Sequence, residues 1–221
     1  KKQHITMTTT EDVNIVDYMR RYPEQFSEYV KILDRTSISP FLNAYGAYTA
    51  FAPTNDAIKS YLLEIGKNST DELDTTTLKN LCKLHIIQDT ISTPAFVDGK
   101  LYAPTMYGQF LVTTVNTSGV TIVNRRAAIT KPNVLTGNGY VHVIDKVLIP
   151  ATLTVAKMVE QNSRYSIFTQ ALKATGYYDS LNIVNNPDTT RRWRSLLAES
   201  DSILNVNGIA SYAALNAKYN N

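Results

Sequence analysis

The sequence contains one cysteine, one tryptophan and few charged side chains. Of its 221 residues only 19% are charged, and 22 basic against 19 acidic side chains leave a formal net charge of +3. A single cysteine excludes an internal disulfide framework and a zinc site made of cysteines. Nucleic-acid binding is not indicated either, because such domains carry clustered basic residues and a pI above about 9, whereas the pI of this chain is near 8.8.

Long apolar runs are also absent. No stretch approaches the ~18 apolar residues of a membrane-spanning helix, and no basic–apolar–small pattern of a signal peptide is present. Because the sequence begins at Lys1 rather than at a methionine, we expect a signal or lipoprotein leader to have been removed. The 43% of hydrophobic residues and the 14 tyrosines are typical of a folded domain with β-structure and a polar surface.

The residues up to Pro150 divide into a helical part and a strand-rich part. A polar leader, residues 1–11, precedes amphipathic spacing that predicts helices over residues 13–19, 26–33, 54–65 and 71–88. Short β-branched segments predict strands over residues 48–52, 101–102, 110–115, 120–123, 127–130 and 140–149. Helices followed by antiparallel strands predict an α+β domain over residues 12–150.

The remaining residues, 151–221, repeat the opening of this domain. Residues 155–159 and 167–172 again have amphipathic spacing, and residues 196–204 align with residues 50–58. Both aligned segments combine an apolar strand, a hydroxyl residue that can cap a helix, and an apolar helix start. No strand-rich part follows. The sequence therefore predicts one complete domain and the N-terminal half of a second.

Two motifs, in order, resemble the signatures of fasciclin-like domains. The first is TAFAPTNDAI at residues 49–58, and the second is NGYVHVIDKVLIP at residues 138–150. Between them, LCKLHII at residues 81–87 lies where the family has its central Tyr-His segment. The resemblance covers residues 12–150 fully and residues 151–221 as an incomplete second copy. It is closest to two-repeat fasciclin lipoproteins of Gram-negative bacterial surfaces.

This resemblance implies a twisted wedge of seven β-strands flanked by helices. Such domains mediate adhesion and other extracellular contacts, with no cofactor and no catalytic activity. The resemblance implies motif or structural roles for Thr54, Asn55, Asp56, His85, His142 and Asp145. One departure is Leu84, which replaces the tyrosine of the family's Tyr-His pair. Partner recognition attributed to that pair in animal members is therefore not transferred to this chain.

Cys82 and His85 are the candidates for catalysis, because a thiol and an imidazole on one helix face can act as nucleophile and base. That hypothesis would make the chain a Cys–His hydrolase. The alternative is a buried histidine bonded to the backbone, beside a cysteine that serves as a small core residue. We favour the alternative, because the spacing supplies neither a third orienting group nor a cleft.

The other polar candidates have structural explanations. His142 and Asp145 lie three positions apart in a predicted strand, which places them on opposite faces. With His4 in the leader, the histidines show no metal-ligand spacing. Asn55, Asp56 and Asp201 fit helix capping. The basic cluster at residues 191–194 contains a tryptophan, so it could bind phosphate or stack on a sugar or a base. A solvated strand edge protected by charge explains it better.

The resemblance therefore implies a non-enzymatic extracellular binding or adhesion module on a cell-surface lipoprotein of the bacterial outer membrane. Its partner would be a protein or a glycan, and it would meet the membrane only through an N-terminal anchor. The alternative is an accessory subunit of an outer-membrane complex for nutrient or glycan uptake. An adhesin predicts an exposed Tyr and Asn patch, and a subunit predicts a flat apolar surface above about 1,000 Å². The half domain predicts an apolar face covered by further chain, by the first domain or by another chain.

Overall fold

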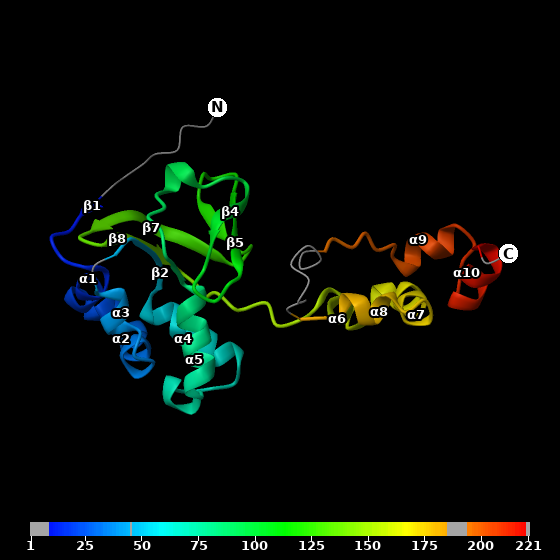
Figure 1. The fold of residues 1–221 in the computed structure, drawn as a ribbon, viewed down its shortest axis with the longest axis horizontal. Helices are drawn as coiled ribbons and strands as arrows, with labels where there is room; N and C mark the ends of the chain where they lie inside the picture. The colour runs from blue at the N-terminus through cyan, green and yellow to red at the C-terminus, as the bar shows by residue number, and fades with distance from the viewer. Residues whose placement is uncertain (1–8, 45, 185–193, 220–221) are drawn as a thin grey trace. The chain divides into compact units, whose positions relative to one another are not determined.

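The computed structural model describes residues 9–44, 46–184 and 194–219. Its chain divides into two compact units, Lys1–Pro150 and Ala151–Asn221. The first unit combines helices with a mixed sheet (Figure 1), which confirms the predicted α+β class.

One sheet runs through the first unit. Its strands are β1 (Thr9–Thr10), β2 (Tyr48–Pro53), β3 (Ile86–Ile87), β4 (Gly99–Pro104), β5 (Phe110–Val115), β6 (Thr121–Val123), β7 (Ala127–Thr136) and β8 (Gly139–Ile144). They follow the order β3-β2-β8-β7-β6-β5-β4, and β1 pairs separately with β7. β2 and β8 are parallel, with Tyr48 opposite Gly139 and Pro53 opposite Ile144. The two fasciclin-like motifs are therefore neighbouring strands.

The parallel pair approaches so closely that one position must be glycine. Gly139 has a φ of +145°, and a Cβ atom added there would lie 1.8 Å from the backbone oxygen of Tyr48. No side chain can occupy that space, because the obstacle is backbone. The Gly137–Asn138–Gly139 turn thus sets the distance between the two motif strands.

Helices pack on the central strands of this sheet. They are α1 (Ile15–Arg21), α2 (Pro23–Arg35), α3 (Ser39–Leu42), α4 (Asn55–Glu64) and α5 (Thr75–Leu84). The side chain of Thr54 accepts a hydrogen bond from the backbone N–H of Ala57 and caps α4. The side chain of Asp74 accepts from the N–H of Thr77 and caps α5. Thr54 is the hydroxyl residue that the sequence predicts as a cap.

The predicted helix over residues 71–88 is wrong at both ends. Thr70–Glu72 form a separate 3₁₀ turn, and α5 ends immediately before His85, which is its C-cap. Ile86–Ile87 form β3, which pairs antiparallel with β2. Their apolar spacing continues the helical pattern, but β-branched residues next to a strand edge favour the sheet.

Two further boundaries differ from the sequence prediction. Thr9–Thr10, which fall in the expected leader, form β1 beside β7. β8 ends at Ile144 rather than at residue 149, because the chain then turns toward α5, where the N–H of Leu148 donates to the imidazole of His85. Both differences arise from pairing between segments that are distant in sequence.

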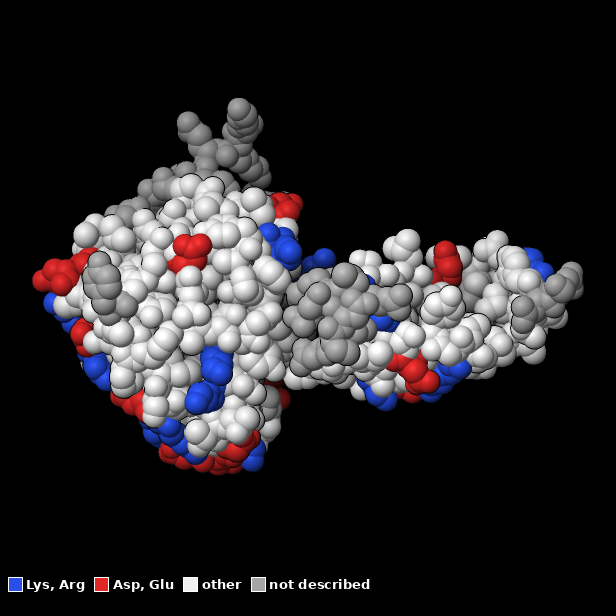
Figure 2. Space-filling model, viewed as in Figure 1, with Lys and Arg blue, Asp and Glu red and all other residues white. Residues whose placement is uncertain are grey.

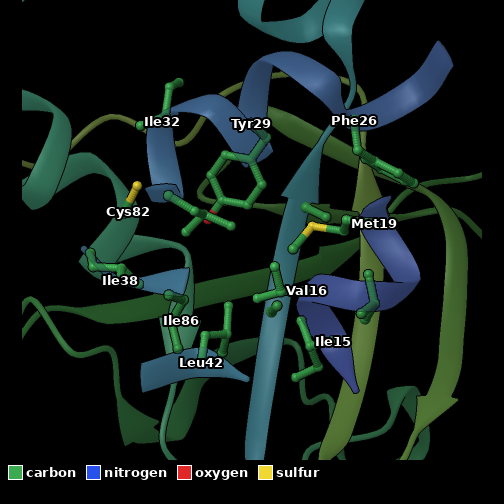
Figure 3. Close-up of a cluster of buried hydrophobic side chains, with 14 of the residues drawn as sticks. Ile15, Val16, Met19, Phe26, Tyr29, Ile32, Ile38, Leu42, Cys82 and Ile86 are labelled. Atoms are coloured by element: carbon green, nitrogen blue, oxygen red, sulfur yellow. The ribbon is translucent and has the colours of Figure 1, made fainter. Parts of the chain in front are cut away.

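Two apolar clusters of the first unit meet at β2. The first includes Phe26 and Tyr29 of α2, together with side chains of α1, α3 and α5 (Figure 3). The second is enclosed by the strands and includes Phe51. Because side chains alternate along a strand, Ala50 and Ala52 belong to the helical cluster and Phe51 to the strand cluster. All six residues of β2 are buried.

The described part of the second unit is helical. Its elements are α6 (Val155–Glu160), η3 (Ser163–Tyr165), α7 (Ser166–Ala174), α8 (Tyr177–Leu181), α9 (Asp201–Val206) and α10 (Tyr212–Tyr219). The apolar strand expected at the start of residues 196–204 is wrong, since residues 194–200 form neither a helix nor a strand. The counterpart strand, β2, is held by β3 and β8, and the described part of this unit contains nothing equivalent to them. None of the described helices is both long and apolar enough to cross a membrane.

Candidate binding surface

Asn55, the first residue of α4, is bonded to α2 rather than to its own helix. Its side-chain amide donates to the backbone oxygens of Pro23 and Glu24, and its Oδ1 accepts from the N–H of Glu28 at 2.9 Å. The expected capping role therefore applies to Thr54, whereas Asn55 joins two helices. Asp56 follows in the first turn of α4, where it is exposed.

His85 is fully buried, and backbone groups bond both of its ring nitrogens. Nδ1 lies 2.7 Å from the carbonyl oxygen of Leu81, and Nε2 lies 3.0 Å from the backbone nitrogen of Leu148. Nδ1 therefore carries the hydrogen and Nε2 accepts. Burial lowers the pKa of His85 to about 4, because a charged ring is poorly solvated there. The imidazole holds the end of the strand-rich part against α5.

Cys82 lies in the same core but makes no catalytic pair with His85. Its Sγ receives a weak hydrogen bond from the hydroxyl of Thr36 at 3.8 Å. Burial raises the pKa of the Cys82 thiol to about 12, so the thiolate that nucleophilic chemistry requires is not formed near neutral pH. With both His85 nitrogens bonded to backbone, the pair provides neither a nucleophile nor a free base.

His142 and Asp145 also occupy separate environments. Nε2 of the buried His142 donates to the carbonyl oxygen of Ile91 at 2.8 Å, and its Nδ1 accepts from the N–H of Asn133. Asp145 is exposed, and its carboxylate accepts from the N–H of Ala128 at 2.7 Å. Burial lowers the pKa of His142 to about 4. The neutral ring, which belongs to β8, links β7 and the loop before β4 through these two hydrogen bonds.

Sequence reasoning missed Asn138, which is a buried connector. Its Oδ1 accepts from the N–H of Ile15 at 2.9 Å, at the start of α1. Its Nδ2 donates to the carbonyl oxygens of Leu42 and Ala44 at 2.7 and 3.1 Å. The signal was an asparagine between two glycines, which indicates a turn but not the helices that the turn holds together.

The structure bears on two other features of the sequence, the absence of metal-ligand spacing and the basic cluster. Within residues 9–44, 46–184 and 194–219, no group of three or more His, Cys, Asp or Glu side chains could hold a metal ion. Of the basic cluster at 191–194, residues 191–193 lie outside the described residues. Arg194 donates to the backbone carbonyl of Ser180.

A polar groove of about 460 Å³ lies between α2 and α4. The side chains that line it include Asp56, Lys31 and Lys67. These two are paired with Asp71 at 2.7 Å and with Glu72 at 3.5 Å. The charges of these two lysines are therefore already compensated within the protein.

The strands present a different kind of surface, here named the outer sheet face. It consists of Lys100, Tyr102, Phe110, Val112, Thr114, Ile122 and Ala128. These side chains alternate with buried neighbours along β4 to β7, and the pairs Lys100/Val112, Thr114/Ile122 and Ile122/Ala128 face each other across strands. They are half-buried or exposed, and Tyr102 is 59% exposed.

Aromatic and apolar groups dominate the outer sheet face. The Tyr102 hydroxyl donates to the carboxylate of Asp89 at 2.9 Å, and the ammonium of Lys100 lies 4.1 Å from the ring centre of Phe110. Of the tyrosine and asparagine side chains expected in an adhesive patch, Tyr102 lies on this face, whereas Asn133 and Asn138 are buried and bond the backbone.

Charge is distributed unevenly over the first unit. On the face shown in Figure 2, charged side chains gather along the helical side of this unit, from α1 to the end formed by α4 and α5, and fewer of them lie over the strands. The ion pair between Lys31 and Asp71 belongs to the charged end. A weakly charged surface with an exposed aromatic ring is typical of protein contact sites, which are depleted in charge at their centre.

Comparison with known proteins identifies the family. The model of the fasciclin domain matches residues 24–150, which is more than half of the chain. This protein belongs to the fasciclin family. The predicted resemblance is confirmed, and both motif strands lie within the matched residues of this fasciclin domain.

The fasciclin relatives come from animals and from a bacterium. Stabilin-1 of Homo sapiens is 26% identical over 138 residues, and transforming growth factor-beta-induced protein ig-h3 of Sus scrofa is 27% identical over 149 residues. These alignments cover 59% and 66% of this chain but only 5% and 21% of the relatives. Protein sll1483 of Synechocystis sp. is 27% identical over 135 residues, covering 58% of this chain and 68% of that protein.

A solved FAS1 domain pair from the insect cell adhesion molecule fasciclin I also resembles this chain. The match has a TM-score of 0.41 and 21% sequence identity, and it covers 76% of this chain and 56% of that chain.

Proposed function

We propose that this fasciclin protein is a non-enzymatic extracellular adhesion module that binds a protein or glycan through the outer sheet face. The observation that carries the proposal is the exposed Tyr102, which lies on the same sheet face as the half-buried Phe110, Val112 and Ile122. Rigid aromatic side chains contribute most to protein recognition, and an aromatic ring can also stack on a sugar. Family membership supports an adhesive rather than a catalytic role.

The experiment measures retention of protein-coated beads on immobilised collagen, fibronectin and bacterial surface polysaccharide. We expect retention on at least one of these surfaces, and a loss of roughly tenfold or more for Tyr102→Ala and Ile122→Glu. Leu63→Asp, at an exposed position of α4, is the matched control and should bind like wild type. Equal retention of wild type and both sheet-face variants, or retention of none, contradicts the proposal.

We further propose that the module lies on a bacterial surface, as an outer-membrane lipoprotein anchored through a segment before Lys1. The bacterial relative sll1483 supports the bacterial setting. Metabolic labelling of the natural protein with radioactive palmitate tests the anchor, and an unlabelled protein in the soluble fraction contradicts it.

The second candidate function is an accessory subunit of an outer-membrane complex for nutrient or glycan uptake. The observation that favours it is the apolar part of the outer sheet face, Val112 and Ile122, which a fixed protein partner would bury. Co-purification of the natural protein from solubilised membranes separates the candidates. A stoichiometric partner that Ile122→Glu releases supports the subunit, whereas a free monomer supports the adhesin.

A further inference from the structure

A small polar hollow lies where α1, α2 and α3 meet, and it shares no residue with the outer sheet face. Its volume is about 220 Å³, and its lining residues are Arg20, Asp34, Ser37, Ser39, Pro40 and Asn43. Sites for drug-sized ligands are larger, roughly 300–1,000 Å³. The hollow therefore suits a small polar group, such as one ring of a larger ligand.

Two polar atoms at this hollow have no hydrogen-bond partner among the described residues. They are Oγ of Ser39 and Oδ1 of Asn43, and both atoms are closed to solvent in this structure. Buried polar atoms without a partner are rare in folded proteins, so each one requires an explanation. The amide oxygen needs a donor, whereas the hydroxyl can bond either a donor or an acceptor. A ligand that carries hydroxyl groups satisfies both atoms.

Asp17 holds the other groups of the hollow in place. Its Oδ1 accepts from Arg20 at 3.4 Å, and its Oδ2 accepts from Nδ2 of Asn43 at 2.9 Å. The second bond fixes the amide of Asn43 and leaves Oδ1 as the unpaired acceptor. Arg20 also donates to Asp34 at 3.0 Å. These bonds use only part of the guanidinium, so further N–H groups of Arg20 can donate to a ligand.

A second hollow, of about 390 Å³, adjoins the first and shares Arg20 and Asp34 with it. It is also lined by Pro23, which is exposed, and by Val30, which is half-buried. These apolar side chains offer a surface for the C–H groups of a ring.

The groove between α2 and α4 continues the series, because it shares Ser27 and Lys31 with the second hollow. The three hollows thus form a row beside α2. A row of this kind suits a ligand made of repeating polar units.

The lining of the row argues against other classes of ligand. An anion is disfavoured because Asp17 and Asp34 already compensate the charge of Arg20, and a metal ion is repelled by the guanidinium itself. Bound peptides commonly add a strand to a sheet edge, lay a helix in an apolar groove or dock prolines on aromatic side chains. The described lining residues belong to helices and adjacent loops, and none of them is aromatic.

We propose that this row is a second binding site, which takes a neutral oligosaccharide. One sugar ring lies in the first hollow, and the next ring packs on Pro23 and Val30. A hydroxyl of the first ring donates to Oδ1 of Asn43, and another bonds Oγ of Ser39, which rotation about one bond directs into the hollow. Arg20 donates to a further hydroxyl. Sugar hydroxyls suit this arrangement because each of them both donates and accepts.

The test is a calorimetric titration with soluble neutral hexasaccharides of glucose, mannose, galactose and xylose. We expect at least one dissociation constant below about 1 mM, and no binding of the charged trigalacturonate. Ser39→Ala should weaken binding by roughly three- to tenfold, and Arg20→Gln by roughly tenfold or more, because charged donors form the stronger hydrogen bonds. Ser60→Ala, at an exposed serine of α4 that lines none of the three hollows, is the matched control and should bind like wild type.

Stability separates a binding role of Ser39 from a structural one. Because its Oγ has no partner among the described residues, Ser39→Ala should leave the urea midpoint unchanged or raise it while it weakens sugar binding. A lowered midpoint would show that the hydroxyl is structural and would overturn its role in the site. Arg20→Gln, which removes only exposed ion pairs, then tests the hollow independently.

Tyr102→Ala distinguishes this site from the proposed adhesion surface, and it should leave the titration unchanged. Retention of both sheet-face variants on polysaccharide alone would contradict the adhesion surface and still support this site. Three results would overturn the proposal: binding of none of the hexasaccharides, which means that the hollow takes water only; equal binding by wild type, Ser39→Ala and Arg20→Gln; or binding that is lost in Tyr102→Ala.

Discussion

The backbone N–H of Leu148 donates to Nε2 of His85 at 3.0 Å, and joins the end of the strand-rich part to the end of α5. The same arrangement recurs at His142, whose Nδ1 accepts from the N–H of Asn133. In both rings the acceptor nitrogen is occupied by a backbone donor. Protonation of either ring would replace that hydrogen bond with a repulsive contact inside the core.

The first prediction is therefore a loss of stability in mild acid. Burial lowers the pKa of His85 and of His142 from 6.5 to about 4, so between these pH values the unfolded chain binds protons that the folded chain does not. The free energy of unfolding is highest above pH 6.5 and should fall by about 3 kcal/mol for each histidine as the pH approaches 4. Urea unfolding at pH 7.5, 6, 5 and 4 measures this decrease.

The control is a variant in which one of the two rings cannot titrate. His85→Gln should be less stable at pH 7.5 but should lose about half as much stability between pH 6.5 and 4 as wild type. A stability that stays constant over this range in wild type, or rises, would show that these rings are not buried as neutral groups.

The second prediction concerns the thiol. Because burial raises the pKa of Cys82 to about 12, a thiol reagent such as DTNB should react only after unfolding. Cys82→Ala should cost about 1 kcal/mol of stability through lost packing and leave binding unchanged. Reaction of the native protein within seconds, or loss of a hydrolytic activity in Cys82→Ala, would support the Cys–His hydrolase instead.

The third prediction tests the connector that the sequence did not reveal. Asn138→Ala removes the hydrogen-bond partner of the Ile15 N–H in α1 and of the carbonyl oxygens of Leu42 in α3 and of Ala44 after it, and should destabilise the first unit by roughly 2–4 kcal/mol. Asn138→Asp keeps the acceptor for Ile15 but cannot donate to Leu42 and Ala44. It should therefore also destabilise, as measured by urea unfolding. Asn68→Ala, at an exposed position, is the comparison. Equal urea midpoints for Asn138→Ala, Asn138→Asp and Asn68→Ala would contradict the prediction.

The fourth prediction separates the two units. Asp201→Ala removes the acceptor for the N–H groups of Ser166 and Ile167 and should cost the second unit about 1–2 kcal/mol. Hydrogen exchange should accelerate in α7 and stay unchanged in α2. Asn55→Ala should give the opposite pattern. If Asp201→Ala accelerates exchange in α2, or in neither helix, the two positions are not equivalent.

Local patterns predicted much of the fold. Thr54 is a hydroxyl residue followed by amphipathic spacing, and it caps α4 as expected. Such features depend on neighbours within one or two turns, so they can be recognised in a single sequence. The family signal has the same origin, since each motif is a strand joined to its own turn or cap.

The candidate site was predicted less well. Tyr102, Phe110 and Ile122 lie on three different strands, and only the sheet register places them on one face. The buried positions of Asn133 and Asn138 likewise depend on partners far along the chain. The composition indicated a surface rich in tyrosine and asparagine. Asn133 and Asn138, however, lie in the core, where they form hydrogen bonds with backbone groups.

The sequence by itself determined the features that depend on composition and on adjacent residues. These are the scarcity of cysteine and charge, the helical and strand periods, the two motifs, and the repeat of the first domain's N-terminal part in residues 151–221. Tertiary structure decided that Ile86–Ile87 leave the helical pattern to become β3, that His85 and His142 are neutral rings, and that Leu197 is exposed where Phe51 is buried. These outcomes depend on which distant segments pair with each other. Which segments pair depends on the free energy of the whole fold, so it cannot be predicted from the spacing of neighbouring residues.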